Sequence, residues 1–402
     1  MDPSPAATER VRVWARSALA LESGRSPRPS EPSNLTPHEL LAAVYRHRLV
    51  ELLGEHADAL ELPAPIPEQL STQRRRAQRS IMVQSLEIGR IAAMFSAAGI
   101  RWLSLKGPAL AVQTTGAVDG RGGGDIDVFV AAESVEETFR LLMGAGWAVR
   151  APNPGDPASW AWRHVLRTYN EMTFDGPHSS VDVHWRLDPT LSALPDFETA
   201  WSHRVDVELP GITVATLSAA AAFSHTCHHA AKDEWRWLRS LVDVHRLARA
   251  PDVWTARELS RLELATLAVT DSCVGLPDGL PPSVQDQLRT VSGRAADRAR
   301  RAQDRPVLAE NAVPGAHMWR ATRYRLSASR APADLRIAVA AAALPAGSVA
   351  GLTASSAWAA LPRLVARRLG RLLSKVAIWM GGGPSGAGRA GGAGGPVRPD
   401  VR

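Results

Sequence analysis

The sequence has 402 residues, 45% of them hydrophobic, which is enough for two or three domains with substantial cores. Its two cysteines, Cys227 and Cys273, lie far apart, which excludes a disulfide framework and a CxxC metal motif and favours a reducing, cytoplasmic compartment. The formal charge of +7 comes almost entirely from arginines spread along the chain, so it does not by itself indicate nucleic-acid binding.

The N-terminal 34 residues are rich in Pro, Ser and Arg, lack the basic start and apolar core of a secretory signal, and are predicted to be a disordered leader. Thr36, Pro37 and Glu39 then have the spacing of an N-cap, a first-turn proline and a capping-box glutamate. Apolar residues at helical spacing over residues 40–53 and 68–98 predict amphipathic helices in an N-terminal segment, residues 35–99.

From residue 100 to residue 216 the pattern changes to short apolar runs separated by turns, which predicts an α/β core. Helices are expected near residues 108–113 and 135–143. Strands are expected over residues 101–105, 125–130, 147–150, 170–174, 180–187 and 205–209. With helical segments before and after this core, the fold class is α+β.

The C-terminal part, residues 217–380, is predicted to be all-helical, and the spacing of Trp235, Trp237, Leu238 and Leu241 indicates core packing rather than a base-stacking platform. Residues 337–352 are the longest apolar stretch, but they are mostly alanine and are interrupted by proline and glycine. We therefore expect no integral membrane association.

The end of the chain carries two further patterns. Residues 363–375 predict a basic amphipathic helix, either with a solvated face or in weak contact with an anionic surface. The Gly-rich residues 381–402 are predicted to be a disordered tail.

Two short acidic patterns fall within the expected strands. Asp125 and Asp127 are two apart, so in a strand both carboxylates point to one face, where they repel each other unless a cation lies between them. Asp182 lies in a second β-branched run, and a neighbouring strand would bring it to the same ions. The interpretation is a two-metal phosphoryl-transfer site, with a merely solvated strand face as the alternative.

Other polar residues surround this pattern. Lys106 and Gly107 form a turn after the first expected strand, and Arg121 opens a glycine run, so Lys106 and Arg121 are candidates for phosphate binding or simply solvent-exposed turn residues. His184 shares the strand face of Asp182 and is either a carboxylate-orienting group or a structural histidine. Glu171, in the neighbouring strand, has the same ambiguity.

A histidine-rich segment follows in the helical part. His225 and His229 are four apart, as zinc ligands on a helix are, but Thr226 stands where a zinc protease has glutamate. A polar face against the sheet, formed by these two with His228, Asp233 and Asp243, is favoured over a zinc site.

The order of these motifs resembles the bacterial nucleotidyltransferase-like proteins of the DNA polymerase beta superfamily. The resemblance rests on Leu105-Lys106-Gly107, on Arg121-Gly-Gly-Gly-Asp125-Ile-Asp127, on Gly144-Ala-Gly-Trp147 and on Val181-Asp182-Val-His184-Trp185, and it extends over roughly residues 40–250. The segments Phe223-Ser-His225-Thr-Cys-His228-His229 and Trp237-Leu-Arg-Ser-Leu-Val-Asp243 resemble the helical half of that family.

The resemblance implies a mixed sheet flanked by helices, in which Asp125, Asp127 and Asp182 hold two Mg²⁺ ions, with Mn²⁺ as an alternative. It also implies an NTP as substrate, with phosphate contacts from Lys106, Gly107 and Arg121 and with His184 nearby. The chain departs from the family in its turn, where Lys106-Gly107-Pro108 replaces the usual glycine followed by glycine or serine.

These expectations give a cytoplasmic, metal-dependent nucleotidyltransferase that moves an NMP from an NTP to a hydroxyl of an acceptor, which is a small molecule, a protein or RNA. Two alternatives remain. One is a non-catalytic sensor of Mg-NTP, and the other is a non-enzymatic interaction protein that docks through its basic C-terminal helix.

Overall fold

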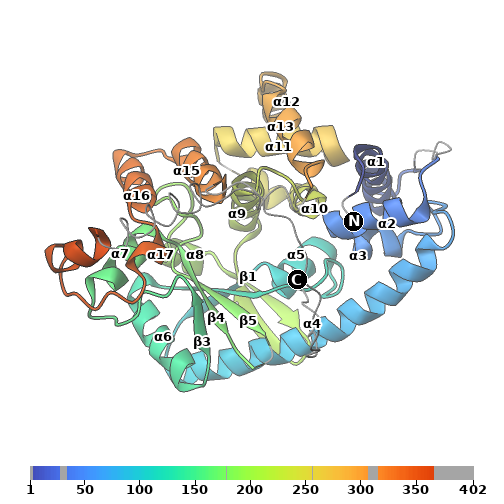
Figure 1. Ribbon diagram of the computed structural model, residues 1–402. Helices are drawn as coiled ribbons and strands as arrows, with labels where there is room; N and C mark the ends of the chain where they lie inside the picture. Colours follow the sequence, from blue (N-terminus) through green and yellow to red (C-terminus); the bar gives the residue numbers. More distant parts are fainter. Residues whose placement is uncertain (1–2, 28–33, 178, 256, 307–315, 366–402) are drawn as a thin grey trace, which may run out of the picture.

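The computed structural model describes residues 3–27, 34–177, 179–255, 257–306 and 316–365. Its centre is one seven-stranded mixed sheet with the strand order β3-β4-β5-β2-β1-β7-β6. Helices lie below the sheet and above it, with α4 and α6 along the lower side in Figure 1 and α9 and α10 on the upper side. The predicted α+β class is confirmed.

The strands agree with the sequence patterns apart from one addition. They are β1 (Trp102–Leu105), β2 (Ile126–Val130), β3 (Ala148–Ala151), β4 (Glu171–Asp175), β5 (Ser180–His184), β6 (Val205–Leu209) and β7 (Ile212–Thr216). Strand β7 was not predicted; Gly211, at φ +80°, turns the chain back so that β7 pairs with β6 as a hairpin.

The helices include three that the sequence did not predict, α1, α7 and α8. The helices around the sheet are α4 (Ile66–Ala97), α5 (Gly107–Thr115), α6 (Val135–Gly144), α7 (Trp160–Thr168), α8 (Phe197–Ser202), α9 (Ala219–Lys232) and α10 (Leu238–Leu247). The others are α1 (Pro5–Glu22), α2 (Pro37–His47), α3 (Val50–Glu55), α11 (Arg261–Val274), α12 (Pro282–Arg289), α13 (Arg294–Gln303), α15 (Ala316–Ala328), α16 (Pro332–Ala343) and α17 (Ala346–Val349).

Alternation along the central strands separates the two faces of the sheet. Ile126, Val128 and Val130 of β2 point to the lower face, where they form one core with α4, α6 and α7. On the upper face Phe129 packs edge-on against Phe197 of α8 and belongs to the same core as Phe223 of α9. The rest of that face, over β2, β5 and β4, carries polar side chains, and this is where the candidate site lies.

The prediction of a disordered leader is wrong for Pro5–Glu22, which form helix α1. Ser4 caps the helix by accepting a hydrogen bond from the Ala7 amide, and Pro5 occupies the first turn. Val11, Trp14 and Leu19 are buried on its inner face. The Pro, Ser and Arg residues that suggested disorder are concentrated after the helix, and its buried face mixes these apolar residues with small and polar ones such as Ala15, Thr8 and Arg12.

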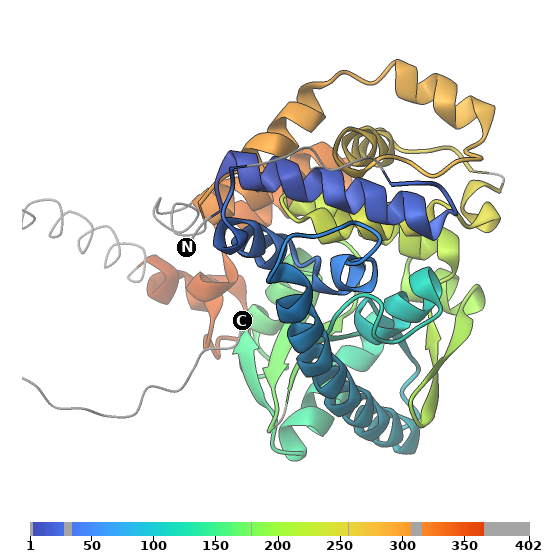
Figure 2. The ribbon, with the colours of Figure 1, turned by 90° about the vertical axis from the view of Figure 1, so that its right-hand side faces the viewer.

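Helix α1 also joins the N-terminal and C-terminal helices. One apolar core contains residues from α1 to α4 together with residues of α9, α10, α11, α13 and α15. Figure 2 shows α1 lying across these helices. The division of the chain into domains at residues 34, 99, 216 and 380 remains a prediction. The helices that precede the α/β part in the sequence and those that follow it nevertheless share a single hydrophobic core.

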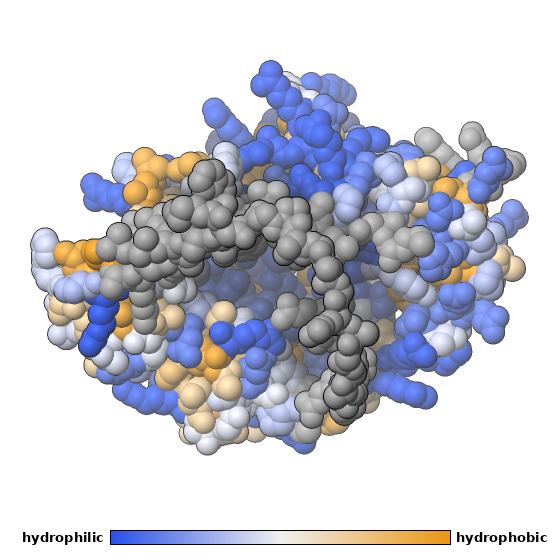
Figure 3. Space-filling model, in the orientation of Figure 1, coloured by the Kyte–Doolittle hydropathy of each residue, from blue (hydrophilic) through white to orange (hydrophobic). Residues whose placement is uncertain are grey.

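Two predictions fall largely or wholly outside the described residues. The Gly-rich tail, residues 381–402, is not described, and of the basic helix at 363–375 only residues 363–365 are described, at the end of a helical stretch that starts at residue 357. Among the described residues no helix combines the length and apolar character needed to cross a membrane. In Figure 3 hydrophilic residues cover much of the coloured surface, with hydrophobic patches among them.

Candidate functional site

The candidate site begins with two carboxylates on adjacent strands. β2 and β5 run parallel, and their register places Asp127 directly beside Asp182. Ligand atoms of Asp127, Asp182 and His184 all lie within 4.8 Å of one another. The structure therefore brings together three of the predicted site residues. Asp182 and His184 are two apart on β5, so their side chains point to the same face of the sheet.

Asp127 is buried, and cationic or hydrogen-bonding groups surround its carboxylate. Lys106 Nζ and His184 Nε2 each lie 3.0 Å from Asp127 Oδ1. Burial alone would raise the pKa of Asp127, but the charge of Lys106 and the hydrogen bond and charge of His184 hold it well below its usual range. Asp127 is therefore ionised at any pH near neutral.

Asp182 has the opposite electrostatic character. Burial, followed by the negative charge of Asp127, raises its pKa to about 6. Thr173 Oγ1 donates a hydrogen bond to Asp182 Oδ1 at 2.6 Å. At neutral pH two neighbouring carboxylates are thus both charged, and the second is ionised at an energetic cost that a cation would remove.

Glu171 extends the cluster onto β4. Its Oε2 lies 3.2 Å from His184 Nδ1 and its Oε1 lies 3.6 Å from Lys232 Nζ. Burial would raise the pKa of Glu171, but the charges of Lys232, His184 and Lys106 lower it to about 2. His184 thus lies between two carboxylates, Asp127 and Glu171.

The histidines of α9 divide between two environments. His225 and His229 line a small pocket together with Lys106, Glu171 and Lys232. Burial and nearby positive charge hold the pKa of both histidines well below the ordinary value, so they face the pocket as neutral rings. His228 instead points away, and its Nδ1 lies 3.0 Å from the hydroxyl of Tyr324.

Asp125 lies apart from this cluster. It is exposed in the loop just before β2, and its carboxylate is not among the metal-capable group found within the described residues. Gln84 Nε2 on α4 anchors the loop by donating hydrogen bonds to the backbone oxygens of Gly124 and Asp125. The expectation that Asp125 lies within the strand is wrong, because β2 starts at Ile126, and a metal-binding role for Asp125 remains a prediction.

The Lys106-Gly107 turn has an unusual backbone. Lys106, between β1 and α5, has φ +47° and ψ −145°, and Gly107 follows at φ +44°. A non-glycine residue in such a conformation costs about 1–3 kcal/mol and persists only where the surroundings enforce it. This turn directs the ammonium of Lys106 back onto Asp127, the register partner of Leu105.

Arg121 is buried, and its Nε donates to Asp243 Oδ2 at 2.8 Å rather than pointing at Asp127. It belongs to what we call the arginine cluster, formed by Arg48, Arg121, Arg236 and Arg239. Burial and then the charges of Arg121 and Arg48 lower the pKa of Arg239 to about 9. Burial lowers the pKa of Arg48, and the negative charges of Asp233 and Asp125 partly offset this shift. The cluster is therefore close enough to the loop that carries Asp125 to feel its charge.

Sequence reasoning did not identify Arg48, Arg239 or Lys232 as site residues. They come from the end of α2, from α10 and from the end of α9, and in an arginine-rich chain no local pattern distinguishes the two arginines. Lys232 is one of only three lysines, a rarity that could have singled it out as it did Lys106.

The site thus combines a mixed sheet flanked by helices, a carboxylate pair on adjacent parallel strands and a positive-φ turn beside it. The chain belongs to a protein family described as uncharacterised nucleotidyltransferase, whose model matches residues 33–269. This match confirms the nucleotidyltransferase part of the resemblance. A comparison with curated proteins finds no match for this chain.

Proposed function

We propose that the protein transfers an NMP from an NTP to a hydroxyl group of an acceptor, with divalent metal ions held by Asp127 and Asp182. The observation that carries this proposal is the pairing of these two aspartates across parallel strands, one with a depressed and one with a raised pKa. A solvated strand face would not hold two carboxylates together in a partly buried position.

The donor set fits Mg²⁺ or Mn²⁺. Carboxylate oxygens are the ligands that these hard cations prefer, and Lys106 Nζ already provides one positive charge at Asp127. Asp125, exposed at the end of the glycine run, is proposed as a further ligand that joins when the ions bind. When bound, the ions would neutralise the triphosphate and align the acceptor hydroxyl with the α-phosphorus.

The residues of the chain would divide the remaining work. Lys106 and the arginine cluster would hold the β- and γ-phosphates. Support comes from Arg239, whose Nε is buried without a hydrogen-bond partner in the described part of the chain. Asp182, ionised above pH 6, would accept a hydrogen bond from the acceptor hydroxyl. The acceptor oxygen would then bond to the α-phosphorus as the bond to pyrophosphate breaks, and the hydroxyl proton would pass to Asp182 and from there to solvent.

The proposal is tested by calorimetric titration with each of the four NTPs, with and without Mg²⁺. Wild type should bind one or more NTPs only with the metal, and Asp127→Asn should lose this binding. Asp206→Asn, on the exposed strand β6, is a matched control that should bind like wild type. Absence of NTP binding by the folded wild type, or unchanged binding by Asp127→Asn, would exclude the proposed site.

The rival within this fold is a sensor that binds Mg-NTP without transferring anything. It is separated from an enzyme by incubating the protein with α-labelled NTP and panels of small molecules, proteins and RNA. Label that becomes covalently attached to an acceptor in wild type but not in Asp182→Asn supports transfer. Tight binding with no labelled product over all panels supports the sensor.

A further inference from the structure

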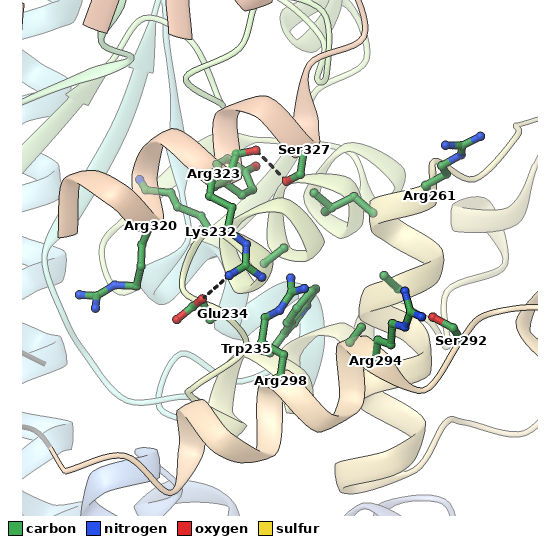
Figure 4. Close-up of a pocket in the computed structure, with 15 residues that line it drawn as sticks. Lys232, Glu234, Trp235, Arg261, Ser292, Arg294, Arg298, Arg320, Arg323 and Ser327 are labelled. Carbon is green, nitrogen blue, oxygen red and sulfur yellow. Dashed lines mark hydrogen bonds and ion pairs between the residues drawn. The ribbon is translucent and has the colours of Figure 1, made fainter. Parts of the chain in front are cut away.

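A second concave site lies among the C-terminal helices, and its lining does not include Asp127, Asp182 or Glu171. It is a cavity of about 300 Å³ between α9, α11, α13 and α15 (Figure 4). Its lining is strongly cationic and contains one carboxylate, that of Glu234. The cationic side chains are those of Lys232, Arg261, Arg294, Arg298, Arg320 and Arg323.

Apart from Lys232, which lies 3.6 Å from Glu171, these cations are poorly neutralised by the described residues. Arg323 lies 3.9 Å from Glu234, which is at the limit of an ion pair. Within the described residues Arg294, Arg298 and Arg320 form no salt bridge. Burial and then the charge of Arg323 lower the pKa of Arg298, so the guanidinium groups of the cavity are held close enough to repel one another.

The floor of the cavity is rigid. Trp235 is held on both sides, because its indole Nε1 donates to Thr266 Oγ1 and its carbonyl accepts from Gln303 Nε2. Glu234 and Trp235 both have positive φ, at +57° and +55°, although neither is glycine. A bulky residue rarely adopts this conformation, and its persistence indicates that the surroundings enforce it.

We propose that this cavity binds a small phosphorylated compound, at a site separate from the proposed NTP site and independent of metal. Guanidinium groups pair bidentately with phosphate oxygens, and several of them around one recess require a multiply charged ligand. A volume of about 300 Å³ with an indole wall suits a small molecule. A nucleic-acid strand would need an open basic stripe instead.

Two further observations place this site in relation to the rest of the molecule. Four of its six cations, from Arg294 onward, lie beyond residue 269, where the family match ends, so this basic lining is largely outside the matched region. Lys232 lines both this cavity and the pocket beside Glu171. A ligand in the cavity would therefore compete with Glu171 for the ammonium of Lys232.

The test is titration of the full chain with inorganic tripolyphosphate in the presence of EDTA, so that binding through metal is removed. Wild type should bind, and Arg298→Ala/Arg323→Ala should weaken binding at least tenfold. Arg301→Ala removes a charge from the same helix outside the cavity and should change binding by less than twofold. Arg298→Lys should retain part of the affinity.

The fold of each variant is checked by thermal unfolding without ligand. Arg294→Ala provides a second test, because this side chain is exposed at the cavity and its removal does not disturb packing. It should weaken tripolyphosphate binding severalfold. Absence of metal-independent binding, or equal binding by wild type, Arg294→Ala and Arg298→Ala/Arg323→Ala, would overturn the proposal and leave the NTP proposal untouched.

Discussion

Asp127 and Asp182 are the same kind of side chain on neighbouring strands, yet their surroundings shift their pKa values in opposite directions. Lys106 and His184 favour the charged form of Asp127. Asp182 is partly buried beside that charge, and the charge of His184 and a hydrogen bond from Thr173 offset it only in part. Replacing each aspartate by asparagine should therefore affect the stability of the metal-free protein with opposite sign.

For Asp182 the pKa rises from 3.8 in the unfolded chain to about 6 in the folded protein. The folded state therefore binds more protons between these values, and stability falls as pH rises from about 4 to 6. Asp182→Asn removes this penalty and should raise the free energy of unfolding by about 1–3 kcal/mol at pH 7, with little change at pH 4. Denaturant titrations at both pH values measure the difference.

Asp127→Asn is the matched comparison. It leaves Lys106 and His184 facing a neutral amide, so we expect a loss of about 1–3 kcal/mol at pH 7. If both variants lower the stability by the same amount, the two carboxylates do not have the opposite environments described above.

Lys106 combines backbone strain with a functional charge, and two substitutions separate these contributions. Lys106→Ala and Lys106→Gly both remove the ammonium that faces Asp127 and should both weaken NTP binding. Only glycine adopts φ +47° without strain, so Lys106→Gly should be more stable than Lys106→Ala by about 1 kcal/mol or more. Equal midpoints in urea would show that this turn relaxes in solution.

Sequence patterns identified Asp127, Asp182, His184 and Lys106 because each lies in or next to a strand whose alternation is readable from neighbouring residues. The same patterns misplaced Asp125, since a strand that starts one residue later leaves its carboxylate in a loop. Arg121 was identified, but its partner Asp243 is 122 residues away. Contacts of that kind depend on tertiary packing and have no local pattern.

At the scale of elements, α1 is tied to the candidate site through its last residue. Glu22 accepts hydrogen bonds from Arg246 and Arg249 of the α10 region. Arg246 is buried and also donates to the carbonyl of Gly120, which precedes the glycine run before Asp125. A helix that the sequence patterns did not predict thus supports the loop that carries a proposed ligand.

Glu22→Gln tests how much the ion pair between Glu22 and Arg246 stabilises the fold. The change leaves the buried guanidinium of Arg246 without a counter-charge, and we expect the free energy of unfolding to fall by about 2–4 kcal/mol. Glu136→Gln, which breaks an exposed pair with Arg140 on α6, should cost less than about 0.5 kcal/mol. Thermal unfolding compares the two, and similar small losses would argue that α1 contributes little to the fold.

At the scale of the whole molecule, the helices of both chain ends enclose histidines in apolar surroundings. His47 is fully buried, and burial followed by the charges of Arg46 and Arg12 lowers its pKa to about 3. Burial lowers the pKa of His245 to about 4, although its Nδ1 pairs with the Gly275 carbonyl. Both side chains remain neutral in the folded protein at a pH where the unfolded chain is protonated.

The folded protein should therefore lose stability as pH falls below 6.5, the ordinary pKa of histidine, until about pH 4. Each of these two histidines contributes up to about 1.4 kcal/mol per pH unit, or about 2 kcal/mol at pH 5. Asp182 has a raised pKa and so stabilises the folded protein as pH falls from 6 to 4. It is outweighed by the histidines, since the pKa values of His225 and His229 are lowered like that of His47.

Guanidinium denaturation at pH 7, 6 and 5 measures how steeply the free energy of unfolding changes with pH, and His47→Gln should make this slope shallower by about 1 kcal/mol per pH unit. A slope unchanged by His47→Gln would mean that water reaches this ring in solution, and that the core shared by the N-terminal and C-terminal helices is less tightly closed than its packing indicates.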